Sequence, residues 1–114
     1  MVEINSTRLL DDLAALRRIG GHGTGVVREA FTATHLEGRR WLARRFAEAG
    51  LRPVWDPIGN LFGLPPTGRP AVLIGSHSDT QPEGGWLDGS YGVICGLEIA
   101  RAAQEAGLRR CHIN

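Results

Sequence analysis

The sequence predicts an α/β fold of about three helices packed on a small mixed sheet. Three stretches carry apolar residues at helical spacing, and short extended segments bounded by Pro and Gly lie between them. The 114 residues are 42% apolar and 22% charged, which is typical of a globular domain and argues against disorder. A chain of this length can bury one modest hydrophobic core.

The first helix is expected from about Asn5 to Ile19. Asn5 or Ser6 can cap its N-terminus, and a pair of glycines at 20–21 ends it. Leucines 9, 13 and 16 form one apolar stripe. The polar residues between them are then expected to face solvent, namely Arg8, Asp11, Asp12, Arg17 and Arg18.

A glycine-rich run follows over residues 20–25, and we expect a flexible loop there. Its glycines suggest a phosphate-binding loop, but their spacing fits neither of the two common nucleotide-binding patterns. Nucleotide binding by this loop is therefore disfavoured.

The second helix is expected to begin near Thr34, because Thr34 and Glu37 have the spacing of a capping box, and to end at Gly50. Its core face consists of Leu42, Phe46 and Ala49, with help from Trp41. Arginines 39, 40, 44 and 45 resemble a nucleic-acid patch. On a capped helix they are more simply a solvated face, on which Glu48 can pair with Arg44.

Extended segments are expected over residues 51–55 and 60–64, joined by a turn with Pro and Gly. The apolar run at 71–74 predicts a strand buried on both faces. A third helix is expected from Ser90 to Ala106. Its buried face is Val93, Ile94, Leu97 and Ala100, and its polar stripe is Glu98, Arg101 and Glu105. Another strand is expected from Leu108 onward.

The loop over residues 75–89 carries the candidate chemistry, because sites in α/β sheets gather beyond the carboxyl ends of strands. His77 offers an imidazole ligand for a metal ion, and Asp79 can accept a hydrogen bond from its other ring nitrogen. Asp88 offers a carboxylate, and the glycines at 84–85 allow the loop to fold back toward His77.

Each of these residues also has a purely structural interpretation. Asp88 precedes the third helix and could be its N-cap, and a His-x-Asp pattern is common by chance. Glu83 suits a solvated loop position, and Trp86 suits a cover over the core. Spacing alone therefore leaves the metal site and these structural roles open.

Composition excludes several function classes. The formal net charge of +1 gives no electrostatic reason to expect nucleic acid or an anionic membrane as partner. The N-terminus shows no signal peptide, and no apolar run is long enough to span a membrane. Cys95 and Cys111 form no recognisable disulfide framework, so we expect the reducing environment of the cytoplasm.

The block from Gly75 to Gly89, with Gly92-Val93 and the Gly96-Leu-Glu stretch after it, resembles the first metal-binding block of the hydantoinase/carbamoylase amidases. That group includes N-carbamoyl-L-amino-acid hydrolases, beta-ureidopropionases and allantoate amidohydrolases, in the aminoacylase/carboxypeptidase superfamily of dinuclear zinc hydrolases. The resemblance also covers Gly25-Val-Val-Arg, Glu48-Ala-Gly-Leu and Gly59-Asn-Leu-Phe, and extends to about Gly107.

The resemblance implies roles for individual residues. His77 matches a histidine ligand of one metal ion, Asp79 the catalytic-site carboxylate that orients it, and Asp88 the aspartate that bridges two metal ions. The implied cofactors are two divalent ions, zinc or else manganese, cobalt or nickel, which activate water for hydrolysis of a ureido or amide C–N bond. Gln81 and the glycines at 84–85 are expected to border the substrate pocket.

The chain departs from the family pattern in three respects. Its 114 residues contain no adjacent Glu pair to supply the general base and a further ligand, and they match neither the family's further downstream histidines nor its separate smaller domain. His22 and His35 suit exposed or structural roles, and His112 lies where the resemblance has faded. We therefore expect the N-terminal part of a larger catalytic α/β domain, inactive alone, from a family of homodimers that act on small ureido or N-carbamoyl amino acids. The alternative is a non-catalytic α/β binding module.

Overall fold

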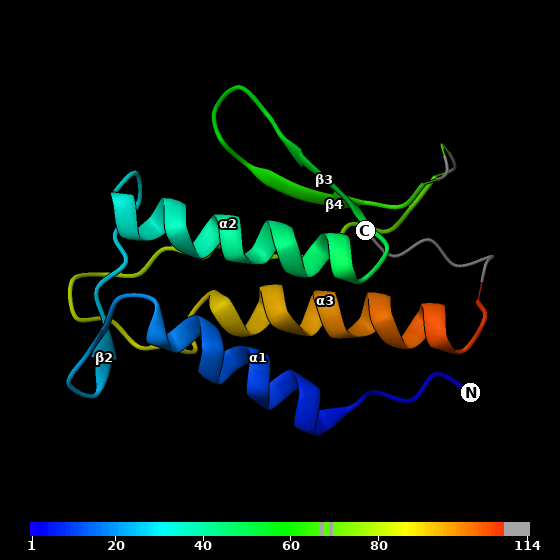
Figure 1. Cartoon of the computed structure of the whole chain (residues 1–114), viewed down its shortest axis with the longest axis horizontal. Helices are drawn as coiled ribbons and strands as arrows, with labels where there is room; N and C mark the ends of the chain where they lie inside the picture. Colours follow the sequence, from blue (N-terminus) through cyan, green and yellow to red (C-terminus); the bar gives the residue numbers. More distant parts are fainter. Residues whose placement is uncertain (67, 69, 109–114) are drawn as a thin grey trace.

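The computed structural model describes residues 1–66, 68 and 70–108. Its elements in chain order are α1 (Ser6–Arg18), β1 (Gly21–His22), β2 (Gly25–Val26), α2 (Ala33–Glu48), β3 (Arg52–Trp55), β4 (Leu61–Leu64) and α3 (Ser90–Glu105). The α/β class and the helices are confirmed (Figure 1). The strands form two separate antiparallel pairs where we expected one small mixed sheet. Most of the strand expected from Leu108 onward, with Cys111 and His112, lies outside the described residues.

Helix α1 forms as its caps predict. The Asn5 side chain accepts a hydrogen bond from the Arg8 backbone N–H at 3.0 Å, and Leu13 and Leu16 are buried. The prediction for Asp12 is wrong, because its side chain is buried rather than solvated. Asp12 accepts from Arg101 of α3 at 2.5 Å and lies 3.3 Å from Arg45 of α2, so it is part of the helix interface.

The glycine-rich run is a tight antiparallel hairpin, which corrects the expected flexible loop. Gly21 pairs with Val26 and His22 with Gly25. Gly20 turns the chain out of α1 with a φ of 84°, a conformation that favours glycine. A Cβ at Gly20 would also lie 2.4 Å from the Val27 carbonyl oxygen, so this close approach requires glycine.

Helix α2 is capped by Thr32 and not, as predicted, by Thr34. The Thr32 hydroxyl accepts from the His35 backbone N–H at 3.2 Å. The predicted core face is confirmed, with Leu42, Phe46 and Ala49 buried. Glu48 pairs with Arg45 at 2.8 Å, one position later than expected, so the predicted pair with Arg44 is wrong.

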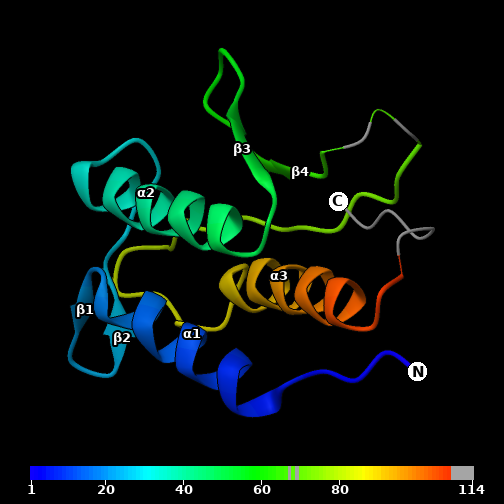
Figure 2. The same cartoon turned by 45° about the vertical axis from the view of Figure 1, so that its right-hand side comes forward.

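The β3–β4 hairpin confirms the two predicted extended segments. Arg52 pairs with Leu64 and Trp55 with Leu61 in an antiparallel register. In the turn, Asp56 accepts from the Asn60 backbone and side-chain nitrogens, both at 2.7 Å. The hairpin contacts α2 on the side away from α1 (Figure 2).

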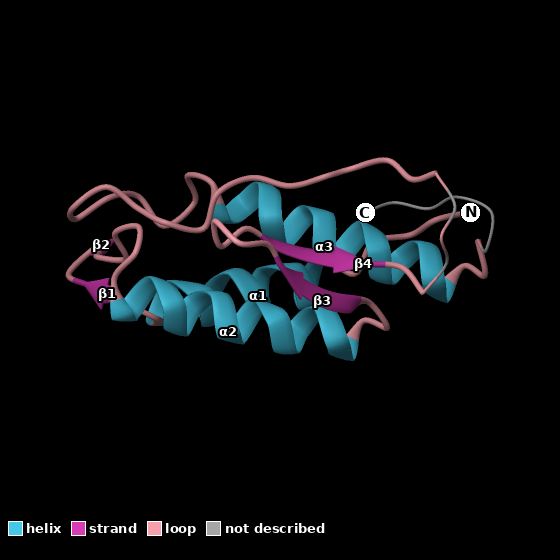
Figure 3. Cartoon of the chain, turned by 90° about the horizontal axis from the view of Figure 1, so that it is seen from above, coloured by secondary structure: helices cyan, strands magenta, loops and turns pink. Residues whose placement is uncertain are grey.

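The buried strand predicted at residues 71–74 is not present among the elements. Val72 and Leu73 are 63% and 70% exposed, in a long segment that runs beside the helices toward the β1–β2 end (Figure 3). An apolar run forms a doubly buried strand only within a sheet whose two faces are both covered by other elements. Among the described residues the two sheets are β1-β2 and β3-β4, and neither includes residues 71–74.

Helix α3 packs on α1 and completes the core. Ile94 and Leu97 are buried as predicted. Glu98 is not part of a solvated stripe, because it is 0% exposed and binds Arg8 through two hydrogen bonds of 2.7 and 2.8 Å. The buried core consists of Leu13, Leu16, Leu42, Phe46, Ala49, Ile94 and Leu97. No helix in the described part of the chain has the length and apolar character needed to cross a membrane.

Candidate metal centre

The candidate site lies in the segment between residue 75 and the start of α3, and backbone hydrogen bonds to the β2 region hold this segment in place. Val26 and Gly84 exchange two hydrogen bonds of 2.9 and 3.0 Å, and the Thr80 N–H donates to the Arg28 carbonyl at 2.9 Å. The buried Thr80 hydroxyl donates to the Val26 carbonyl at 3.1 Å. The loop is therefore fixed at two points, one on each side of its turn.

Both ring nitrogens of His77 face carboxylates. Nδ1 lies 3.2 Å from Asp79 Oδ1 and 3.1 Å from the Asp79 carbonyl oxygen, and Nε2 lies 3.5 Å from Asp88 Oδ2. When Nδ1 carries the proton and donates to Asp79, Nε2 keeps a free lone pair on the side of Asp88. The structure thus brings together all three residues that the sequence singled out.

The N-cap interpretation of Asp88 is wrong. The N-cap of α3 is Gly89, with a φ of 72° and no side-chain hydrogen bond, and the Asp88 carboxylate is exposed. Gly89 lies directly against His77, because a Cβ there would be 2.4 Å from the His77 carbonyl oxygen and 2.5 Å from two ring atoms. The carboxylate of Asp88 is therefore free of a capping role and available to the imidazole.

Replacement of Gly89 by Ala is expected to displace His77 and to destabilise the fold by about 2 kcal/mol, because a left-handed backbone and overpacking each cost about 1 kcal/mol or more. Urea unfolding and the NMR contact between the His77 ring and residue 89 measure both effects. The control is Gly85→Ala in the same loop, where an added Cβ meets no atom within 4 Å. Equal behaviour of the two variants would contradict this account of Gly89.

The donor chemistry of the pair suits a divalent transition metal, since an imidazole nitrogen and a carboxylate oxygen are ligands for zinc, manganese, cobalt and nickel. Among residues 1–66, 68 and 70–108, however, no group of three or more His, Cys, Asp or Glu side chains is arranged to hold an ion. The pair therefore fits a metal ion as part of a ligand set and not as a complete one.

The remaining loop residues follow their structural interpretations. Glu83 is exposed and lies 3.4 Å from the exposed His22 of β1. Trp86 packs against the core and carries Arg17 over its ring at 4.9 Å. Gln81 is exposed near the turn, and its role at a substrate pocket stays a prediction.

Two buried polar residues contact the candidate metal centre, and the sequence analysis did not assign either of them to it. Arg28 is 0% exposed and donates to the Ser78 carbonyl at 2.8 Å. His35, for which a structural role was one prediction, accepts from the Phe31 N–H and has its Nε2 3.0 Å from the Ser78 hydroxyl. Burial, reinforced by Arg39, lowers the pKa of His35, so its neutral form is favoured. No local pattern reveals such partners, because they lie more than 40 residues away.

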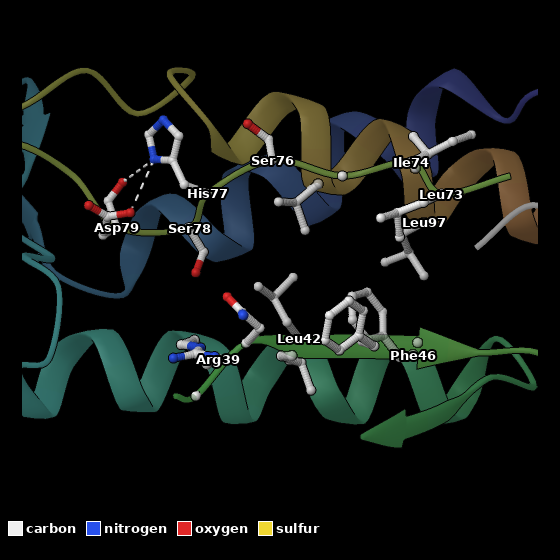
Figure 4. Close-up of a pocket in the computed structure, with 18 of the residues that line it drawn as sticks. Arg39, Leu42, Phe46, Leu73, Ile74, Ser76, His77, Ser78, Asp79 and Leu97 are labelled. Atoms are coloured by element: carbon white, nitrogen blue, oxygen red, sulfur yellow. Dashed lines mark hydrogen bonds and ion pairs between the residues drawn. The ribbon is translucent and has the colours of Figure 1, made fainter. Parts of the chain in front are cut away.

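A cavity of about 730 Å³ lies between the same segment, α2 and β4. Leu42 and Phe46 line one wall, and Leu73 and Leu97 the opposite one (Figure 4). Ser78 points toward α2, whereas the His77 ring points away from Leu42 and Phe46 (Figure 4). His77 and Asp79 are also among the residues that line this cavity, so it adjoins the candidate metal centre.

The known proteins that this chain resembles include several amidohydrolases. The chain is 40% identical over 113 residues to an N-carbamoyl-L-amino-acid amidohydrolase of Rhizobium meliloti, a match covering 96% of this chain and 27% of that protein. It is 40% identical over 73 residues to the allantoate amidohydrolase of Escherichia coli, covering 61% of this chain and 18% of that protein.

Among solved structures, a hydantoinase/carbamoylase family amidase from Burkholderia phymatum superposes with a TM-score of 0.91 at 52% identity, over 96% of this chain and 27% of that one. The chain spans about a quarter of the length of curated relatives that it matches. No family model matches it.

Proposed function

Because the chain belongs, over the quarter of their length that it spans, to the hydantoinase/carbamoylase family of amidases, we propose that it forms the N-terminal part of the catalytic domain of a metal-dependent amidohydrolase. The proposed reaction is hydrolysis of a non-peptide C–N bond in an N-carbamoyl amino acid or a related ureido acid such as allantoate. The names of the relatives support this substrate class. The observation that carries the proposal is the His77 imidazole held between two carboxylates.

In this proposal each of the three residues has a distinct task. Asp79 accepts a hydrogen bond from Nδ1–H of His77 and so fixes the orientation of the ring, which leaves Nε2 as the metal ligand. Asp88 supplies a carboxylate beside that nitrogen, where negative charge between two cations is needed. When bound, the two divalent ions polarise the substrate carbonyl and lower the pKa of water.

The ligand count limits what these 114 residues do alone. One tetrahedral zinc ion takes about four ligands, and the described residues bring together one imidazole and one neighbouring carboxylate for that task. We therefore propose that the 114 residues do not hydrolyse ureido acids without further ligands and a general base. Assembly as a homodimer and a cytoplasmic location are parts of the same proposal, supported by the family and by the cysteine usage.

In the test, this chain replaces the matching quarter of the Rhizobium meliloti amidohydrolase. Hydrolysis of an N-carbamoyl-L-amino acid by this chimera is then measured in the presence of zinc or manganese. Identity of 40% over the matched region makes the exchange structurally reasonable. The proposal expects metal-dependent hydrolysis by the chimera. A folded chimera without hydrolysis would contradict it and would favour a non-catalytic binding module.

A further inference from the structure

Arg28 is a fully buried arginine whose side chain binds three parts of the chain at once. It follows β2 and is 0% exposed. Its Nε donates to the Ser78 carbonyl at 2.8 Å, and its Nη1 donates to the Leu16 and Ile19 carbonyls at 2.8 and 2.7 Å. Its Nη2 donates to the Ser90 hydroxyl at 3.0 Å. All three nitrogens of the guanidinium are therefore hydrogen-bonded.

These acceptors connect the two halves of the candidate metal centre. Ser78 directly follows His77, and Ser90 comes two residues after Asp88, at the start of α3. The Arg28 backbone adds to the connection, because its N–H donates to the Thr80 hydroxyl at 2.9 Å. One planar, rigid guanidinium thus fixes the distance between the segment that carries His77 and the first turn of α3.

Within the described residues, Arg28 forms no ion pair with a carboxylate, so its positive charge is compensated by backbone carbonyl groups. The carbonyls of Leu16 and Ile19 lie at the C-terminal end of α1, where the helix dipole is negative. Burial lowers the pKa of Arg28, and the nearby Asp79 charge opposes this effect. Gly38 of α2 makes room for the side chain, since a Cβ there would lie 2.9 Å from Arg28 Cδ.

We propose that Arg28 is a positioning residue that sets the geometry of the His77–Asp88 pair by binding Ser78 and Ser90 simultaneously. The inference rests on the proposed function as far as the use of that pair is concerned, and the geometry itself can be tested without metal. Loss of the guanidinium frees two segments that no other side chain hydrogen-bonds simultaneously within residues 1–66, 68 and 70–108, so the His77 ring separates from Gly89 and Asp88.

The test compares Arg28→Met with Arg101→Met in the 114-residue chain. Arg101 is the matched control, because it is also a largely buried arginine, with a side chain that is 11% exposed. It likewise joins α1 to α3, through Asp12, but it does so several turns away from Ser90. Two quantities are measured by NMR, namely the contact between the His77 ring and Gly89, and the selective broadening around residues 77 and 88 by Mn²⁺. Urea unfolding shows how much each variant is destabilised.

Arg28→Met is expected to lose the His77–Gly89 contact and to weaken Mn²⁺ binding at the pair about 10-fold or more, as loss of a supporting group does in metal sites. Arg101→Met is expected to keep both while losing stability. Retention of the contact in folded Arg28→Met would overturn the inference. Loss of the contact in Arg28→Met supports the positioning role even where the wild type shows no Mn²⁺ effect, and the metal function is then decided by the chimera assay.

A milder variant covers the case in which Arg28→Met does not fold. Ser90→Ala removes only the hydroxyl that accepts from Arg28 Nη2, and Ser90 is 1% exposed. The same two NMR measurements apply, with a smaller change expected in the same direction. An unchanged contact and unchanged Mn²⁺ affinity in Ser90→Ala, in a chain that has lost this hydrogen bond, would overturn the inference.

Discussion

In the chimera with the Rhizobium meliloti amidohydrolase, His77→Ala is expected to abolish hydrolysis of an N-carbamoyl amino acid. The substitution removes the proposed imidazole ligand, whereas loss of an outer carboxylate costs about 10–100-fold in metal sites. Asp88→Asn is expected to act as strongly as His77→Ala, because it removes the charge beside Nε2. Asp79→Asn is expected to fall within the 10–100-fold range, since it only orients the ring.

The measurement is the steady-state rate at saturating zinc or manganese, together with the metal content of each variant. Glu83→Gln serves as the control, because Glu83 is an exposed residue of the same loop whose carboxylate lies 3.4 Å from His22 and not at the His77 ring. The order of effects distinguishes the assigned roles. A larger loss for Asp79→Asn than for His77→Ala would contradict the assignment of ligand and orienting group.

The second large effect is expected for Glu98→Gln, which should lower the free energy of unfolding by about 2–3 kcal/mol, because a neutral amide replaces the buried carboxylate that accepts the hydrogen bonds of the charged Arg8. The Glu98 side chain is 1% exposed and accepts from Arg8 at 2.7 and 2.8 Å and from the Asn5 N–H at 2.8 Å. Glu105 binds the same Arg8 but is 57% exposed. Glu105→Gln is therefore the matched control, with an expected loss below about 1 kcal/mol.

The pH dependence of this effect follows from the ionisation of Glu98. Burial opposes its ionisation, but the hydrogen bonds from Arg8 and Asn5 outweigh burial and lower the pKa of Glu98 below its ordinary 4.5. A lowered pKa means that the carboxylate stabilises the fold fully above pH 4.5 and that this contribution is lost as the pH falls below it. Urea unfolding should show wild type and Glu98→Gln converging in acid; a constant difference would contradict this assignment.

The helices were predictable because their ends carry strong local signals. Asn5 caps α1 and Gly20 terminates it with a positive φ, and both signals are visible in the sequence. The N-terminus of α2 was misplaced by two residues, because Thr32 and Thr34 are equally good caps by composition. Local chemistry therefore gave the elements and left their boundaries uncertain by about a turn.

Residues whose environment depends on distant partners were not predictable. Glu98 was expected to face solvent, and its burial depends on Arg8, 90 residues away in the chain. Arg28 is buried and donates hydrogen bonds to carbonyl groups of α1 and of the loop over residues 75–89. No sequence pattern predicts these partners. The prediction of a buried strand at 71–74 was wrong, because burial on both faces depends on other elements that cover both faces of a sheet, and these cannot be foreseen from the run itself.

The candidate site was more predictable than the packing around it. The spacing of His77, Asp79 and Asp88 around a glycine-containing turn allowed the imidazole and the two carboxylates to lie together, and the family resemblance assigned them to one site. The sequence could not show that Gly89 rather than Asp88 caps α3, which frees the carboxylate. That distinction depends on backbone angles and on the close packing of His77 against Gly89.

The central claim is that these residues form part, and only part, of a dinuclear metal site. Calorimetric titration of the isolated 114-residue chain with Zn²⁺, combined with an assay for ureido-acid hydrolysis, tests this most directly. We predict no tight binding of two ions and no hydrolysis, and at most a weak binding event that His77→Ala removes. Binding of two ions with nanomolar affinity, accompanied by hydrolysis of an N-carbamoyl amino acid, would contradict the claim.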